Sequence, residues 1–166
     1  MREFRKATPQ DNLDISKISV ESWKFAYKGI MSDATLDALD YEKRATYRSK
    51  FLEKTTLSTY VCFENGRPVG FVDYELCRDD DCNDQVGEIW AIYVLPKVIG
   101  SFIGKKLFHI AADDLASKGC IEITVWVLSE NKLARAFYER QEFFVDGVEK
   151  KYQGLREIRY RKKLEK

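Results

Sequence analysis

The chain has 166 residues, which is the length of one ordinary domain. Hydrophobic residues make up 45% of it and charged residues 33%, a composition that is typical of a folded globular protein and excludes a disordered chain. The 28 Lys and Arg residues are nearly balanced by 27 Asp and Glu residues, and the resulting charge of +1 argues against a dedicated nucleic-acid-binding protein.

The first residues lack the apolar core of a signal peptide, and the apolar run that ends at Leu95 is far shorter than a membrane span. The four cysteines, at 62, 77, 82 and 120, include no C-x-x-C pair, and His109 is the only histidine, so the usual spacing of a Cys/His zinc site is absent. We therefore expect a cytoplasmic protein with reduced thiols, no metal and no membrane partner, in which the cysteines are packing or surface residues.

The first half of the chain predicts one strand followed by helices. Residues 3–7 form the strand, and Thr8 and Pro9 open an amphipathic helix that runs to about residue 28 and ends at Gly29. Residues 32–54 predict one or two further helices.

The second half predicts strands alternating with helices. Asn65-Gly66 is a hairpin-turn signal, residues 78–84 form an acidic loop, and a helix begins near residue 103 and ends at Gly119. A short helix begins at Ser129 or Asn131 and runs through residue 140. The predicted strands are 57–63, 69–76, 87–95, 120–128, 143–148 and 156–162. The expected fold is α/β, with a mixed central sheet of six or seven strands flanked by helices in one domain, 1–166.

A strand, Pro96, a glycine-containing loop and a helix follow one another at 92–107. Such a loop presents unpaired N–H groups and the positive end of the helix dipole, which suits a pyrophosphate, and Lys97, Lys105 and Lys106 add positive charge. The loop is neither a P-loop nor a Rossmann fingerprint, and its spacing alone favours a simple structural turn over a phosphate site.

A second segment, 131–143, places Ala134, Phe137 and Tyr138 on one face of a short helix. Its phenol can pack in the core or present its O–H to a cleft.

The order of elements and these two segments together resemble the GNAT superfamily of acetyl-CoA-dependent N-acetyltransferases. The resemblance covers nearly the whole chain, and 21–30 also looks like the first helix of many bacterial members. Its motifs are the strand 88–96, the helix start 103–107 and the pattern Asn131-x-x-Ala134-x-x-Phe137-Tyr138. The resemblance implies a GNAT-like fold, acetyl-CoA as cosubstrate without a metal, and the primary amine of a small molecule as acceptor; homodimers are common in such families.

The chain departs from the family pattern in its phosphate loop. The family reads Arg/Gln-x-x-Gly-x-Gly/Ala, whereas this chain has Ile99-x-x-Phe102-x-Gly104, and a customary glycine further on is Glu142. A positive φ at Phe102 would cost of order 1–2 kcal/mol, and the missing charged side chain at 99 forfeits roughly 1.5–3 kcal/mol of hydrogen bonding. Because the donors of such a loop are mainly backbone N–H groups, we expect weaker acetyl-CoA binding rather than none.

The resemblance also implies roles for individual residues. The main chain of Ile92, Tyr93 and Val94 pairs with the pantetheine arm, and a backbone N–H there holds the oxyanion as the amine attacks the thioester directly. Tyr138 protonates the leaving thiolate, and Glu88 is the candidate base, with a surface carboxylate as the alternative interpretation. The remaining cofactor-binding candidates are Ile99, Gly100, Ser101, Phe102, Ile103, Gly104, Lys105 and Asn131.

Between residues 73 and 88 there are seven acids and one base, a charge pattern that would attract a polycation such as a polyamine. The alternative is a solvated loop that balances the basic C-terminal segment. Trp23 and Tyr27, one helical turn apart, either line the acceptor pocket through cation–π contacts or pack in the core. A GNAT-fold protein with weakened catalysis, which senses CoA or another ligand, is the alternative to an active enzyme.

Overall fold

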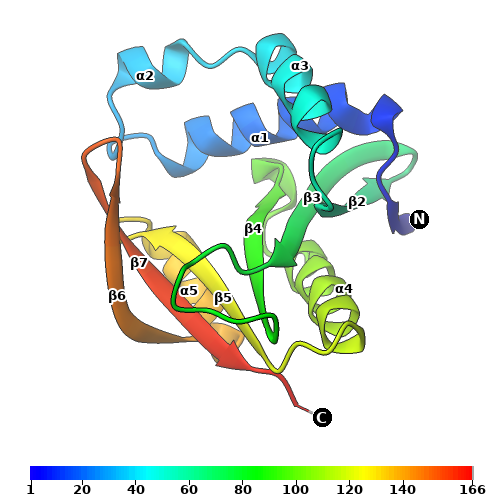
Figure 1. Ribbon diagram of the computed structural model, residues 1–166. Helices are drawn as coiled ribbons and strands as arrows, with labels where there is room; N and C mark the ends of the chain where they lie inside the picture. The colour runs from blue at the N-terminus through cyan, green and yellow to red at the C-terminus, as the bar shows by residue number, and fades with distance from the viewer. Residues whose placement is uncertain (166) are drawn as a thin grey trace. The chain divides into compact units, whose positions relative to one another are not determined.

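The computed structural model describes residues 1–165, in which seven strands form one mixed sheet in the order β1-β2-β3-β4-β5-β7-β6, flanked by helices (Figure 1). The strands are β1 Arg2–Lys6, β2 Ser58–Glu64, β3 Arg67–Leu76, β4 Val86–Val94, β5 Glu122–Leu128, β6 Phe144–Tyr152 and β7 Leu155–Lys163. The α-helices are α1 Asn12–Ala26, α2 Asp33–Asp37, α3 Tyr41–Leu52, α4 Ile103–Ser117 and α5 Lys132–Arg140. β4 and β5 are parallel, whereas β1–β2, β5–β7 and β6–β7 are antiparallel. The predicted α/β fold with a mixed sheet is confirmed.

Three elements differ from the sequence prediction, the first helix and the two closing strands. The first helix begins with a separate 3₁₀ turn, η1 Pro9–Asp11, before α1. The two closing strands are longer than predicted, because Gln153 and Gly154, with φ of 49° and 78°, join them in a two-residue turn. The register of β6 shifts between Val145 and Glu149, around Gly147. This irregularity interrupts the alternation of apolar and polar residues, so the sequence pattern predicted an earlier end for the strand.

Residues 1–73 and 91–111 form one compact unit. Its core includes Ile15 and Ile18 of α1, packed with Val61 and Phe71 of the sheet. In this unit α1 and α3 lie side by side (Figure 1), and Arg48 of α3 donates two hydrogen bonds to the Asp73 carboxylate, at 2.7 and 2.9 Å. The half-buried aromatic and aliphatic side chains at the end of β4 pack against this core, so the segment that leads to the candidate loop rests on it.

Residues 74–90 and the described residues from 112 to 165 form the second compact unit. Here β5 pairs with β7, and β7 pairs with β6 in the C-terminal hairpin, orange to red in Figure 1. Arg159 of β7 is 1% exposed, and its guanidinium donates to three carboxylates, those of Asp79, Asp81 and Asp146. The loop between β3 and β4 is thereby tied to the closing hairpin. No helix within residues 1–165 combines the length and apolar character needed to cross a membrane.

Candidate functional site

The loop between β4 and α4 has the unusual backbone that its sequence predicts. After a single 3₁₀ turn, η2 Pro96–Val98, the chain adopts a left-handed conformation at Gly100, with φ of 84°, and again at Phe102, with φ of 66°. For Phe102 this conformation costs about 1–2 kcal/mol. The Phe102 side chain is 77% exposed, so the chain keeps a glycine-type turn and directs the ring largely into solvent.

Polar contacts within the first unit hold this loop. The Ser101 hydroxyl donates to the Val98 carbonyl, and Arg2 donates to the Ser101 carbonyl at 2.8 Å. The Lys106 amide donates to the Phe102 carbonyl at 3.0 Å, which leaves the N–H groups of residues 103–105 at the start of α4 without an acceptor in the helix. Lys97, Lys105 and Lys106 are exposed. These donors and charges suit an anionic ligand.

The end of β4 is packed closely in the same unit. Gly70 has no Cβ, and one added there would lie 2.9 Å from Val94 Cγ1, 3.1 Å from the Tyr93 carbonyl oxygen and 3.3 Å from Ile103 Cγ2. The Ser22 hydroxyl donates to the Val94 carbonyl at 3.1 Å. The register of β4 with β5 runs from Val86↔Glu122 to Ile89↔Val125, and β4 continues beyond it to Val94. Residues 92–94 are therefore a strand segment beyond that parallel ladder.

The two aromatic candidates on α1 lie next to this segment. The Trp23 indole N–H donates to the Tyr93 hydroxyl at 2.9 Å, and the Trp23 and Tyr27 rings meet edge to face with centroids 5.0 Å apart. Tyr27 is buried, whereas Trp23 is half-buried. The Arg44 guanidinium lies 4.8 Å from the centroid of the Trp23 ring. Sequence reasoning missed Arg44, because α3 brings it to α1 only in the folded chain.

Glu88 lies in the second unit, and its carboxylate is buried rather than exposed. The side chain is 2% exposed, so its interpretation as a surface carboxylate is wrong. Its Oε1 accepts the backbone N–H and the Nε–H of Arg78, both at 3.2 Å, and its Oε2 accepts Nη2–H at 2.5 Å. The same guanidinium lies 3.6 Å from the centroid of the Trp90 ring. A proton acceptor at Glu88 would therefore have to act while it is paired with Arg78.

Asn131 lies directly before α5, and Tyr138 lies on this helix. Both belong to the second unit. The Asn131 side chain accepts the Ala134 N–H at 3.1 Å, which confirms it as the N-cap of this helix. Tyr138 is 6% exposed, with its ring edge to face against Phe137 and Phe143 at 5.1 and 5.4 Å. These contacts fix the orientation of the phenol.

The acid-rich segment is partly neutralised by internal ion pairs. Asp73 pairs with Arg48 in the first unit; in the second, Glu88 pairs with Arg78, and Asp79 and Asp81 pair with Arg159. The Arg159 hydrogen bond holds the pKa of Asp81 at about 2. Four of the seven carboxylates thus bind three arginines of the chain itself, so their charge is partly compensated and the segment attracts a polycation less than its sequence predicts.

Comparison with known proteins decides the family. The sequence profile of the Acetyltransferase (GNAT) family matches residues 20–143. The chain belongs to this family. Its curated relatives include N-acetyltransferases, and the chain is an N-acetyltransferase with a GNAT fold.

Two relatives and two solved structures place this GNAT chain among its neighbours. It is 28% identical to the uncharacterized N-acetyltransferase YuaI of Bacillus subtilis, over 93% of this chain and 92% of the relative. It is 26% identical to a spermidine N(1)-acetyltransferase of Thermoplasma acidophilum, over 91% and 98%. Its fold matches the PaiA N-acetyltransferase of Thermoplasma acidophilum in complex with coenzyme A, with a TM-score of 0.77, 21% identity and coverage of 96% and 98%. YncA of Salmonella typhimurium, with acetyl-CoA, matches with a TM-score of 0.73, 20% identity and coverage of 100% and 95%.

Proposed function

We propose that this GNAT acetyltransferase transfers the acetyl group of acetyl-CoA to a primary amine of a polyamine. The observation that carries the proposal is the similarity to a spermidine N(1)-acetyltransferase over nearly the full length of both chains. The acid-rich segment adds little support, because most of its carboxylates are already paired. The proposal of a polyamine as the acceptor therefore rests on the similarity to this relative rather than on the surface charge of the chain.

The loop and the end of β4 are the proposed cofactor site in the first unit. The free backbone N–H groups at the start of α4 bind the pyrophosphate, with Lys105 as a nearby cation, because the helix leaves these donors unused. The amides of Ile99 and Ser101 donate instead to the carbonyls of Pro96 and Val98, at 3.3 and 3.2 Å, and serve to hold the loop. The main chain of Ile92–Val94 pairs with the pantetheine arm as an added strand would. Asn131 is the remaining cofactor-binding candidate, and its capping bond to Ala134 holds its side-chain oxygen.

The proposed reaction is direct transfer. The neutral amine attacks the thioester carbonyl carbon, the C–N bond forms, and the C–S bond breaks as coenzyme A leaves as a thiolate. A backbone N–H of residues 92–94 stabilises the oxyanion that develops on the carbonyl oxygen. Tyr138 donates its phenolic proton to the thiolate of coenzyme A as the C–S bond breaks. The nitrogen loses one proton as the amide forms, and this proton returns through solvent to the tyrosinate, which is the stronger base, so the protons balance.

Glu88 is the proposed acceptor of the proton that the ammonium group must lose before it attacks. Because its carboxylate is buried and held by Arg78, we propose that the proton reaches it through water rather than directly from the substrate. Trp23 and Tyr27 are the proposed contacts of the acceptor amine, through the face of an aromatic ring. Arg44 occupies a position over the Trp23 ring, so a cationic substrate would compete with it.

The test is a thiol-release assay with acetyl-CoA and a panel of spermidine, spermine, a diamine and a monoamine. We expect turnover with the polyamines, and a loss of at least about tenfold in kcat for Tyr138→Phe. Tyr47→Phe is the matched control, because Tyr47 is 71% exposed on α3 and should keep full activity. Turnover with the monoamine alone would refute the polyamine assignment. Saturable binding of coenzyme A without turnover of any amine would support the ligand sensor instead.

A further inference from the structure

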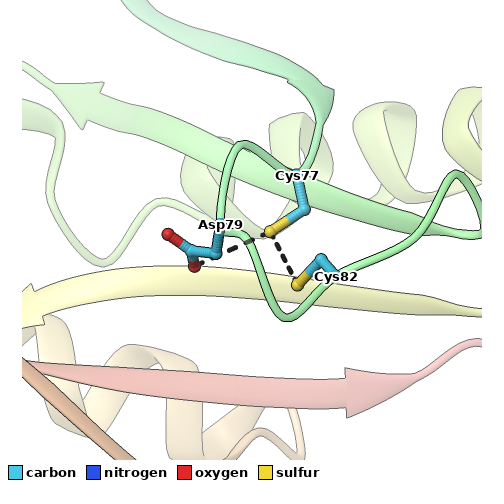
Figure 2. Close-up of side chains that lie close together, drawn as sticks. All are labelled: Cys77, Asp79 and Cys82. Carbon is cyan, nitrogen blue, oxygen red and sulfur yellow. Dashed lines mark hydrogen bonds between the residues drawn. The ribbon is translucent and has the colours of Figure 1, made fainter.

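Two free cysteines approach each other in the loop between β3 and β4. Cys77 and Cys82 are separated by four residues in sequence, and their sulfur atoms lie 2.9 Å apart (Figure 2). Both are partly accessible to solvent, whereas Cys62 and Cys120 are buried. Two backbone hydrogen bonds hold the loop. The Cys77 amide donates to the Val86 carbonyl at 2.8 Å, and the Cys82 amide donates to the Asp79 carbonyl at 3.0 Å.

We propose that Cys77 and Cys82 form a reversible disulfide within this loop. A disulfide has an S–S bond of about 2.05 Å, so the two sulfur atoms have to approach by less than about 1 Å, which side-chain rotation supplies. The proposal concerns the second unit alone and is independent of the acetyl-transfer proposal.

The oxidant of the proposed reaction is a low-molecular-weight disulfide. The thiolate of one cysteine attacks a sulfur of this disulfide, which forms a mixed disulfide and releases one small thiol. The second cysteine then attacks the mixed disulfide, forms the Cys77–Cys82 bond and releases the other small thiol. Two S–H bonds of the protein are lost and two S–H bonds of the small thiol are formed, so protons and electrons balance.

The surroundings assign the first attack to Cys77. The Thr124 hydroxyl lies 3.5 Å from the Cys77 sulfur and 3.3 Å from the Gly87 carbonyl oxygen, so it can turn to the sulfur when Cys77 loses its proton. The Asp79 carboxylate accepts the Cys77 S–H at 3.7 Å. Burial, reinforced by Cys77, raises the pKa of the Cys82 thiol to about 12. Cys82 therefore stays protonated while Cys77 makes the first attack. It loses its proton and attacks as the resolving thiolate in the second step, when Cys77 is bound in the mixed disulfide and no longer adds negative charge beside it.

The same residues resemble a metal site, but their neighbours oppose a cation. One ligand atom each of Cys77, Asp79 and Cys82 lies within 4.8 Å of the others. The Asp79 carboxylate, however, already accepts hydrogen bonds from the Arg159 guanidinium at 2.9 Å and the Trp126 indole at 3.0 Å. Guanidinium nitrogens of Arg159 and Arg161 each lie 4.0 Å from the Cys82 sulfur. A divalent ion would have to displace these cations or lie beside them, whereas a neutral disulfide does neither.

The disulfide would restrain two contacts described above. The ring that it closes contains Arg78, which holds Glu88, and Asp79 and Asp81, which hold Arg159. For a closed loop of this size, the lost entropy of the unfolded chain predicts that oxidation raises Tm by roughly 4–9 °C. A reductant should reverse the shift.

The experiment treats the full-length reduced protein with oxidised glutathione, alkylates the remaining thiols and measures the mass. We expect two of the four thiols to be lost, a peptide cross-link between Cys77 and Cys82, and the rise in Tm. Cys77→Ser and Cys82→Ser should each prevent the cross-link, and Cys82→Ser should accumulate one bound glutathione at Cys77. Cys120→Ala, which changes a buried thiol outside the loop, should still form the cross-link.

Four free thiols after exposure to an excess of oxidised glutathione would overturn the proposal. A stoichiometric zinc complex of the wild-type protein that either serine variant abolishes, together with protection of both thiols from glutathione, would overturn it in favour of a metal site.

Discussion

Arg78 covers Trp90 and holds Glu88 at the same time. Its guanidinium lies 3.6 Å from the centroid of the Trp90 ring and donates two hydrogen bonds to the Glu88 carboxylate. The Arg78 side chain is 53% exposed and that of Glu88 is 2% exposed, so the exposed cation compensates a buried anion. Removal of the Arg78 cation should therefore lower the free energy of unfolding more than the loss of a surface ion pair does.

We expect Arg78→Gln to lower the free energy of unfolding by about 1–3 kcal/mol, because the buried carboxylate loses its charged partner. Urea denaturation monitored by fluorescence measures the change. Arg67→Gln is the control: it removes an exposed charge at the start of β3 and should change the free energy by less than about 0.5 kcal/mol. Equal stabilities of the two variants would show that Arg78 does not stabilise Glu88.

Phe102→Gly should stabilise the protein and tighten the binding of acetyl-CoA. The φ of 66° at Phe102 is strained for a residue with a side chain, and glycine relieves this strain. Because glycine also gives the unfolded chain more conformational freedom, the net gain in the free energy of unfolding should be about 0.5–1 kcal/mol. Removal of the ring from the phosphate loop predicts a dissociation constant lower by roughly threefold to tenfold in calorimetry. Glu142→Gly is the matched control. Its φ is 64°, so it should stabilise the chain similarly and leave the affinity unchanged; weaker binding by Phe102→Gly would contradict this account of the loop.

Gly70→Ala should weaken the binding of acetyl-CoA by displacing the end of β4. The added methyl group would lie 2.9 Å from Val94 Cγ1 and 3.1 Å from the Tyr93 carbonyl oxygen, and such overpacking costs about 1–3 kcal/mol. Gly66→Ala meets no atom within 4 Å but has a φ of +76°, so it should lose about 1 kcal/mol of stability with unchanged affinity. The two variants separate a local effect on the site from a general loss of stability.

Arg44→Ala should lower the KM for spermidine by about fivefold, since it frees the face of Trp23 for a cation–π contact worth about 1 kcal/mol. Steady-state kinetics at saturating acetyl-CoA measures the change. Lys43→Ala removes an equal charge from the neighbouring exposed position and should have a smaller effect. If both variants change KM alike, only overall charge matters and the Trp23 face is not used.

The ion pair of Asp11 with Arg5 should make the free energy of unfolding depend on pH in the acid range. Its hydrogen bonds with Arg5, together with those from Thr8, lower the pKa of its carboxyl to about 2. Unfolded chains then bind more protons than folded ones between this pKa and the unfolded value of about 3.9, so the free energy of unfolding rises with pH through that window. The contribution is complete above the unfolded pKa and is lost as pH falls toward 2. Solvent reaches the Arg5 side chain, which is 37% exposed, so we expect about 1 kcal/mol.

Denaturation of Asp11→Asn between pH 2 and pH 6 tests this expectation. The variant should show a smaller rise in stability with pH than the wild type, whereas Asp37→Asn, at an exposed position of α2, should follow the wild-type curve. An unchanged slope for Asp11→Asn would exclude the Arg5 pair as its source.

The local backbone of this protein was predictable from its sequence. Asn65-Gly66 predicted a hairpin turn, and both residues have positive φ, at 51° and 76°. The family pattern marked Phe102 and Glu142 as positions where glycine is usual, and both adopt positive φ. Such features depend on neighbouring residues and on backbone sterics, which one stretch of sequence determines.

The charges and thiols were decided by the tertiary structure. The sequence left open whether Glu88 is a surface carboxylate, and the folded loop buries it beneath Arg78. The sequence also left open whether the acidic loop is balanced by the basic C-terminal segment, and β7 brings Arg159 to Asp79 and Asp81 from nearly 80 residues away. The spacing of Cys77 and Cys82 matched no known motif, yet the same loop places their sulfur atoms in contact. Electrostatic and sulfur chemistry depend on distances between side chains that are remote in sequence or joined by an irregular loop, and only the folded chain sets those distances.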